Sequence, residues 1–323
     1  MNITFSIIIP VYNSAGILPN LYERIVSTME DLGEPFEIVF VEDCGPDHAW
    51  SVLQKLVHID DRVVAIQLMR NSGQGSATLA GIEQSSGEFI ITMDDDLQHP
   101  PEELPKLIKS IRDDENIDVI IGVPQVSMHS TLRKYGSYIV NKLNTFFLNK
   151  TENLRFSGFR ILRKNISDAL LMFNIPYPAL GPMIVNTTPR VKNIAFKHEK
   201  RTHGGSNYSV KKLLEQFISN FIGYSVLPLH ILAFLGIIGV MFSAITGLFL
   251  LYKYIFIGIS VPGWTTLLLV LLTLTGFTFL AFSIIGEYLL RINQVSTNVS
   301  RWKIRNKINT VKNPNSNCSL NDK

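Results

Sequence analysis

The chain is short of charge and of cysteine, and both shortages narrow what it can be. Only 18% of its 323 residues are charged, 46% are hydrophobic and the mean hydropathy is +0.19. This balance is too apolar for a disordered chain and unusual for a soluble enzyme. The two cysteines, Cys44 and Cys318, lie far apart in the sequence, which excludes a disulfide framework or a cysteine-based zinc site. We therefore expect a globular part in a reducing compartment and a second part in lipid.

The amino terminus lacks the features of a cleaved signal peptide, and the carboxyl-terminal third is poor in acidic residues. A strand-like run over residues 5–10 follows Thr4 directly, without a basic region or a small-residue cleavage site before it. Residues 1–205 carry 20 Lys and Arg against 24 Asp and Glu, whereas residues 206–323 carry 10 against 3. A mildly acidic first part and a basic, apolar second part predict a globular domain followed by a membrane region. They argue against a nucleic-acid partner.

Short β-rich apolar runs recur in the first part of the chain, with amphipathic helical patterns between them. Runs that are apolar on both faces predict an α/β fold with a mostly parallel, Rossmann-like sheet and helices on both faces. Ligands of such sheets bind beyond the carboxyl ends of the strands, so we expect the chemistry just after each run. The runs cover residues 5–10, 37–41, 63–68, 89–93 and 118–122.

Two long uncharged stretches follow the globular part. Residues 231–252 and 254–286 contain no Asp, Glu, Lys, Arg or His, and each exceeds the ~20 residues that span a bilayer. Lysine and arginine are concentrated on the outer flanks, so the positive-inside rule predicts two membrane helices with both flanks in the cytoplasm. Residues 211–224 show the pattern of a helix that lies on the membrane. The expected divisions are a catalytic domain over 1–205, an interfacial helix within 206–225, membrane helices within 226–290 and a basic tail over 291–323.

Three consecutive carboxylates follow the fourth run. Alternate residues of an extended segment point to the same side, so we expect Asp94 and Asp96 to project together while Asp95 faces away. Two convergent carboxylates at the end of a strand suit Mg²⁺ or Mn²⁺ bridging to phosphates, and Gln98 could add an amide oxygen. On this motif alone, an acidic turn that caps the next helix is an equally good explanation.

The ends of three runs together resemble the family 2 glycosyltransferases, whose fold is called GT-A. The motifs are Pro10-Val11-Tyr12-Asn13, Glu42-Asp43-Cys44-Gly45-Pro46-Asp47 and Asp94-Asp95-Asp96-Leu97-Gln98-His99-Pro100-Pro101-Glu102. Three further segments look like the polyprenyl-phosphate branch of this family, which includes dolichol-phosphate mannose synthases and bacterial undecaprenyl-phosphate sugar transferases. They are residues 70–77, Ser157-Gly158-Phe159-Arg160 and residues 286–292.

The resemblance implies both a reaction and a place. The reaction is inverting transfer of a sugar from a nucleotide sugar, with UDP favoured, to undecaprenyl or another polyprenyl phosphate. Its product is a lipid-linked sugar for cell-envelope glycans such as lipopolysaccharide. The implied place is the bacterial inner membrane, with the catalytic domain and the carboxyl terminus cytoplasmic, membrane lipid as a partner and a homo-oligomer formed through the membrane helices.

The same resemblance assigns roles to individual residues. Asp94, Asp96 and Gln98 would hold Mg²⁺ or Mn²⁺. The nucleotide-sugar site would be formed by Pro10, Tyr12, Asn13, Asp43, Gly73, Asp94 and Asp95.

The sequence departs from the family pattern at four places, one of which is the small Gly-Ser turn of the second motif, here Cys44-Gly45. The usual Glu after Tyr-Asn is Ser14, the usual first Asp of the second motif is Glu42, and the acidic residue that precedes Phe-Arg in many relatives is Gly158. A phosphate acceptor tolerates the last absence, because a second pKa of ~6 leaves it anionic without a general base. Basic side chains must then offset its charge, since two anions otherwise repel. The expected catalytic residues are Asp96, Arg133, Arg160 and Arg201.

Two other functions fit part of the sequence. A membrane glycosyltransferase that acts on a sugar hydroxyl would share the donor motifs, although the Q-x-x-R-W pentapeptide of processive synthases does not occur. A transport or scaffold subunit with an inactive nucleotide-binding domain would tolerate Ser14 and Gly158, whereas the intact Asp43, Asp94 and Asp96 argue against it.

Overall fold

The computed structural model describes residues 3–125, 154–175, 178–196 and 301–309, together with single residues between 234 and 292. The chain divides into two compact units, residues 1–210 with 300–323, and residues 211–299. In the second unit, the described residues are helical apart from Gly263. No helix among the described residues is long and apolar enough to cross a membrane. The expected interfacial helix lies outside the described residues, as do most positions of the expected membrane helices, so these remain predictions.

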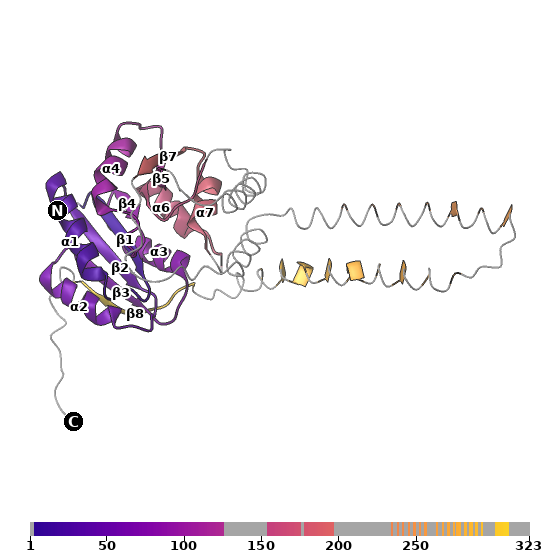
Figure 1. Cartoon of the computed structure of the whole chain (residues 1–323), viewed down its shortest axis with the longest axis horizontal. Helices are drawn as coiled ribbons and strands as arrows, with labels where there is room; N and C mark the ends of the chain where they lie inside the picture. Colours follow the sequence, from indigo (N-terminus) through magenta and orange to yellow (C-terminus); the bar gives the residue numbers. More distant parts are fainter. Residues whose placement is uncertain are drawn as a thin grey trace, which may run out of the picture. The chain divides into compact units, whose positions relative to one another are not determined.

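The first unit is built on a mixed eight-stranded sheet in the order β7-β5-β6-β4-β1-β2-β3-β8 (Figure 1). Strands β6 and β8 run antiparallel to their neighbours, and the other pairings are parallel. The expected mostly parallel sheet is therefore confirmed. The strands are β1 (Phe5–Val11), β2 (Phe36–Glu42), β3 (Val63–Leu68), β4 (Phe89–Thr92), β5 (Val119–Pro124), β6 (Arg160–Arg163), β7 (Val191–Phe196) and β8 (Ile304–Ile308).

Helices cover both faces of the sheet, as the sequence pattern predicts. Helices α1, α2 and α4 pack together on one side, whereas α3 and α6 pack together on the other. In α1 the buried Leu18, Leu21, Ile25 and Met29 recur at helical spacing, and burying each such side chain stabilises the fold by about 1.5–3 kcal/mol. The helices are α1 (Leu18–Leu32), α2 (Ala49–Ile59), α3 (Gln74–Glu83), η1 (Pro101–Glu103), α4 (Leu104–Arg112), α6 (Lys164–Leu171) and α7 (Leu180–Thr187).

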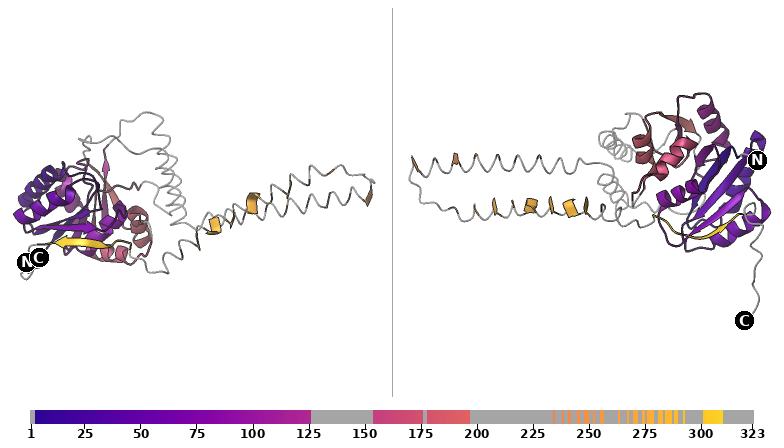
Figure 2. Two further views of the ribbon diagram at one scale, coloured as in Figure 1. Left: turned by 90° about the horizontal axis from the view of Figure 1, so that it is seen from below. Right: turned by 180° about the vertical axis from the view of Figure 1, so that it is seen from behind.

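One edge strand comes from the end of the chain. Strand β8 pairs antiparallel with β3, and Figure 2 shows it in yellow along the sheet. Just before it, Trp302 is buried and its Nε1 donates to Glu83 Oε2 at 3.2 Å, while Arg301 donates to carbonyl oxygens at the end of α6. Residues 304–308, within the expected basic tail over 291–323, thus form a strand of the sheet. An edge strand tolerates exposed basic residues, so its charged composition resembles that of a tail.

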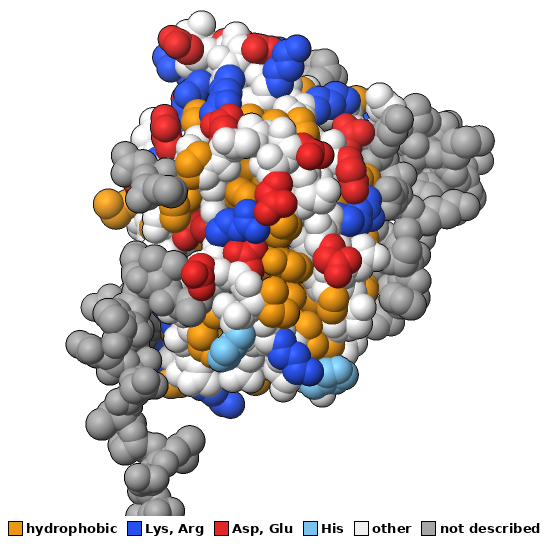
Figure 3. Space-filling view, turned by 90° about the vertical axis from the view of Figure 1, so that its left-hand side faces the viewer, with side chains coloured by type: hydrophobic (Ala, Val, Ile, Leu, Met, Phe, Trp, Pro, Cys, Tyr) orange, Lys and Arg blue, Asp and Glu red, His pale blue; other side chains and the backbone are white. Residues whose placement is uncertain are grey.

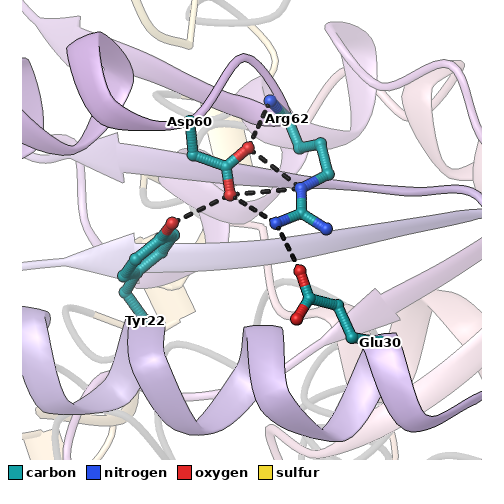
Figure 4. Close-up of polar contacts among 4 residues, drawn as sticks. All are labelled: Tyr22, Glu30, Asp60 and Arg62. Atoms are coloured by element: carbon teal, nitrogen blue, oxygen red, sulfur yellow. Dashed lines mark hydrogen bonds and ion pairs between the residues drawn. The ribbon is translucent and has the colours of Figure 1, made fainter.

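A polar cluster fixes the turn between α2 and β3 to α1 (Figure 4). Arg62 Nη2 lies 2.8 Å from Asp60 Oδ2 and 2.9 Å from Glu30 Oε1. Tyr22 Oη donates to the same Asp60 oxygen at 2.8 Å. Burial alone would raise the pKa of Asp60, but the hydrogen bonds from Arg62 and Tyr22 lower it overall. Burial and the bond to Asp60 raise the pKa of Tyr22 to about 12.

The surface of the first unit carries both signs of charge. Figure 3 shows Asp and Glu interspersed with Lys and Arg around exposed hydrophobic side chains. Ion pairs join Arg24 to Glu102 and Arg112 to Glu34. Exposed pairs of this kind contribute only about 0–1 kcal/mol each, so the stability of this unit rests mainly on its buried apolar residues.

Candidate active site

Three turns at the carboxyl edge of the sheet each contain a strained residue. Asn13 after β1, Cys44 after β2 and Leu97 after β4 have φ angles of 57°, 53° and 60°. Side chains other than glycine rarely adopt this left-handed conformation, and such strain costs of order 1–3 kcal/mol each and gathers at functional sites. Strand β1 pairs with both β2 and β4, so the three turns follow adjacent strands. The structure thus points to the edge at which the sequence places the chemistry.

The acidic loop, residues 94–98, is a turn and not a continuation of β4. The strand ends at Thr92, and Asp95 and Asp96 already lie in a turn, so the alternation expected of an extended segment does not apply. Asp94 Oδ1 accepts a hydrogen bond from Gln74 Nε2 at 2.6 Å. Asp96 Oδ1 accepts one from the backbone N–H of the half-buried Gln98 at 3.1 Å.

Asp95 faces the loop that follows β1. Its Oδ2 accepts hydrogen bonds from the Tyr12 N–H at 3.1 Å and from Ser14 Oγ at 2.5 Å. Burial raises the pKa of Asp95 to about 6. The negative charges of Asp94 and Asp96 also raise it, whereas the two hydrogen bonds lower it. Asp95 therefore joins the first loop of the site to the acidic loop.

The Asp94 carboxylate fills the space beside Gly158. A Cβ atom at position 158 would lie 2.7 Å from Asp94 Oδ2, so an acidic side chain does not fit there. His99 Nδ1 lies 3.7 Å from the same oxygen, and the His99 ring stacks on Phe159 with centroids 5.4 Å apart. The sequence alone favours a plain turn histidine at position 99. Gln74 was also missed as an Asp94 partner, although it lies in the family-like segment 70–77.

Arg160 lies at the start of β6, paired across the sheet with Thr92. It is only 9% exposed, and its Nε and Nη1 atoms have no hydrogen-bond partner among the residues that the structure describes. Burial lowers the pKa of Arg160 to about 10, while the charge of Asp94 acts in the opposite direction, so the guanidinium stays cationic at neutral pH. A buried charge whose hydrogen-bonding capacity is incompletely used costs several kcal/mol, which makes this side chain a candidate for binding an anion.

Asp43 holds the loop that leads into α3. Its Oδ1 and Oδ2 accept hydrogen bonds from the N–H groups of Ser72 and Gly73 at 2.7 and 2.8 Å. Burial raises the pKa of Asp43, and the two backbone hydrogen bonds oppose that rise. Gly73 has a φ of 84°, which suits glycine. The neighbouring Glu42 is buried, and its Oε2 has no hydrogen-bond partner within the described ranges; the sequence motifs mark it only as a departure from the family pattern.

The other expected site residues fall into two groups. Pro10 is buried within β1, whereas Tyr12 and Asn13 are exposed just beyond its end. Two expected basic residues lie outside the described residues: Arg133 and Arg201.

The carboxylates of the acidic loop suit a hard cation that takes some of its ligands from the protein and the others from a substrate. Among the described residues, no three His, Cys, Asp or Glu side chains form a group that could hold a metal ion. Mg²⁺ is usually held by one or two carboxylates and completes its shell with water and substrate phosphates. Asp94 and Asp96 can supply those carboxylates.

An acidic loop, an exposed tyrosine and a buried arginine lie at the carboxyl edge of this α/β sheet, which is where sheets of this class bind their ligands. Residues 6–171 match the sequence profile of Glycosyl transferase family 2. The chain belongs to this family and is a glycosyltransferase.

Similarity to individual proteins extends beyond that segment. The undecaprenyl-phosphate 4-deoxy-4-formamido-L-arabinose transferase of Proteus mirabilis is 33% identical over 316 residues, covering 97% of this chain and 96% of that protein. The enzyme of the same name from Pseudomonas syringae is 34% identical over 295 residues, with coverages of 89% and 86%.

A solved structure has the same fold. Glucosyl-3-phosphoglycerate synthase from Mycobacterium tuberculosis, in complex with Mn²⁺, UDP and phosphoglyceric acid, superposes with a TM-score of 0.52 at 15% identity, covering 68% of this chain and 76% of that one. The expected GT-A-type α/β fold of the catalytic part is therefore confirmed.

Proposed function

We propose that the protein transfers a sugar from a nucleotide sugar to a polyprenyl phosphate, with undecaprenyl phosphate as the first choice. The observation that carries this proposal is the similarity to an undecaprenyl-phosphate sugar transferase over 97% of the chain. That similarity extends well past the family segment, residues 6–171, and so includes the predicted membrane region. The product would be a lipid-linked sugar for modification of cell-envelope glycans.

The surroundings of Arg160 support an anionic acceptor. A phosphate monoester with a second pKa of ~6 is largely ionised at neutral pH, so it can attack the anomeric carbon without a general base. Arg160 offers a buried positive charge and two nitrogens without hydrogen-bond partners in the described part of the chain, and charge-assisted bonds to phosphate are strong. Gly158 has no side chain that could act as a base. Arg133 and Arg201 are proposed as further phosphate-binding residues.

The acidic loop would bind the donor. Asp94 and Asp96, helped by Gln98, would hold Mg²⁺ or Mn²⁺, which when bound offsets the charge of the departing nucleoside diphosphate. Attack from the face opposite the leaving group would invert the anomeric carbon. Since a protein of the same fold binds Mn²⁺ and UDP, these are the first cation and nucleotide to test.

The nucleoside would lie against the ends of β1 and β2. Pro10, Tyr12 and Asn13 would border it, and Tyr12 is 50% exposed and therefore open to a ligand. Asp43 would contact the nucleobase directly. It would also hold the loop at Gly73 in place by accepting a hydrogen bond from the Gly73 N–H.

We further propose that the enzyme works at the cytoplasmic face of a bacterial inner membrane. The uncharged stretches within 226–290 would anchor it, the helix within 206–225 would lie on the lipid, and the membrane helices would associate with those of other copies. This arrangement would bring the site close to the head group of the acceptor.

The proposal is tested by incubating membranes that contain the full chain with polyprenyl phosphate and a panel of labelled nucleotide sugars. We expect label from one of these sugars to enter the organic phase, and we expect an Asp96→Asn variant to transfer it about 10²-fold more slowly or worse. If the label appears only on a water-soluble sugar acceptor, the hydroxyl-acceptor alternative is correct. If no labelled product forms although the nucleotide sugar binds, the proposal is wrong.

A further inference from the structure

A carboxylate lies beside Ser14 although the sequence has no acidic residue at this point of the first motif. It belongs to Asp95, 81 residues further along the chain, and its Oδ2 accepts a hydrogen bond from Ser14 Oγ at 2.5 Å. The same oxygen accepts the backbone N–H of Tyr12 at 3.1 Å. Where many family members place Glu in the first motif, this chain therefore combines a serine with a carboxylate from the acidic loop.

We propose that Ser14 and Asp95 form a positioning pair that holds the Tyr12 loop, residues 12–15, in register with the acidic loop. In this role Asp95 acts through its neighbours and does not touch the sugar. The proposal deepens the proposed function, since it rests on the donor nucleotide binding between these two loops. It also explains how Ser14 can replace Glu without loss of the local carboxylate.

The Tyr12 loop needs hydrogen bonds to neighbouring elements because its backbone is strained and the Tyr12 side chain is exposed. Asn13 has a φ of 57°, and Tyr12 projects into solvent. The loop is bonded at two points by carboxylates from neighbouring turns: Asp47 Oδ2 accepts the Ala15 N–H at 2.8 Å, and Asp95 bonds to the other end. Surrounding structure must over-determine a strained loop for it to persist.

The hydrogen bonds to Asp95, unlike the one to Asp47, link the Tyr12 loop to the acidic loop. Asp95 lies between Asp94 and Asp96 in the sequence, so a shift of its backbone displaces both carboxylates expected at the diphosphate. The pair therefore couples the position of the nucleoside loop to the position of the diphosphate loop. Loss of the pair should weaken binding of a nucleoside diphosphate, which must contact both loops at once.

The test is a double-mutant cycle on the full chain in detergent, comprising the wild type, Asp95→Ala, Ser14→Glu and the double variant. The probe is UDP or GDP with MgCl₂, whichever the wild type binds more tightly, and the readouts are its Kd by calorimetry and the thermal unfolding temperature. We expect Asp95→Ala to weaken binding about tenfold to a hundredfold, the range for losing hydrogen bonds to a charged group. Ser14→Glu alone should also weaken it, because two carboxylates would then face each other.

The double variant decides the question. If the pair positions the loops, a glutamate at position 14 should replace the lost carboxylate and recover at least about fivefold of the binding lost in Asp95→Ala, a coupling that independent sites do not show. If the double variant binds no better than Asp95→Ala, or recovers its unfolding temperature without its binding, the proposal is wrong. Because no lipid acceptor is present, failure of the acceptor assignment leaves this result unaffected.

Discussion

A single added methyl group at Gly158 tests whether the Asp94 carboxylate must stay where the structure places it. The Gly158→Ala change needs no unusual backbone conformation, since Gly158 is not among the glycines with positive φ. Its carbonyl oxygen accepts Thr92 Oγ1 at 2.7 Å, and a methyl group on Cα leaves this bond in place. The perturbation is therefore directed at the Asp94 side chain.

The size of the effect follows from the space available. The new Cβ would lie 2.7 Å from Asp94 Oδ2 and closer still to Oδ1, where ordinary contact begins near 3.4 Å, so the carboxylate must move by about 1 Å. Because a 1 Å displacement of a catalytic group costs about 10²-fold, we expect kcat/KM to fall about tenfold to a hundredfold. The free energy of unfolding should change by no more than about 1 kcal/mol, because a mild overpacking cost is offset by the reduced entropy of the unfolded chain.

The assay is steady-state sugar transfer together with thermal unfolding, and Gly16→Ala is the matched control. A Cβ atom at position 16 would meet nothing within 4 Å, so this control should keep wild-type activity and stability. If Gly158→Ala is as active as Gly16→Ala, the Asp94 carboxylate does not need its observed position. If Gly158→Ala loses activity and its unfolding temperature also falls markedly, the loss of activity reflects a general folding defect instead.

Four further predictions follow from the site, the fold and the sequence. Asp96→Asn should lower turnover by about 10²-fold or more, and excess EDTA should abolish it; full activity in EDTA would remove the metal assignment. Arg160→Ala should abolish transfer to the lipid phosphate, and Arg160→Lys should restore only part of it because lysine lacks the bidentate fork; loss of slow nucleotide-sugar hydrolysis as well would place Arg160 at the donor. Asp60→Asn should lower the free energy of unfolding by about 1–3 kcal/mol at pH 7. Because the folded state lowers the pKa of Asp60, this difference should be present above pH ~4 and disappear as the pH falls further, as urea unfolding can measure. A reporter fused within residues 253–263 should lie outside the cytoplasm and one fused after Lys323 inside it; both reporters on one side would contradict two spans.

The regular part of the fold could be predicted because its signals are local. Residues 5–10 and 63–68 are apolar runs of strand length, and α1 repeats its buried residues at helical spacing, so run length identifies the strands and period identifies the helix. Strand β8 gives no such signal. Its three central residues, Arg305, Asn306 and Lys307, are polar and exposed, and it becomes a strand because the edge of β3 offers it backbone partners.

The site was predictable as a set of positions but not as a set of contacts. Motif order placed Asp94 and Asp95 at one edge of the sheet, yet nothing in the sequence states that Asp95 bonds to Ser14 or that Gln74 bonds to Asp94. Such pairings depend on how distant turns meet in three dimensions. Gly158 shows the same limit, since the reason for its missing side chain is the position of another residue.

The central claim is that the acceptor is recognised as an anion. The most direct measurement compares polyprenyl phosphate with the corresponding free polyprenol under identical conditions, between pH 7 and 9, following label into the organic phase. The account predicts transfer to the phosphate alone, with a rate that stays flat over this pH range because the second phosphate pKa is ~6. If free polyprenol accepts the sugar equally well, the account is contradicted, and a general base such as Asp95 must activate a hydroxyl acceptor.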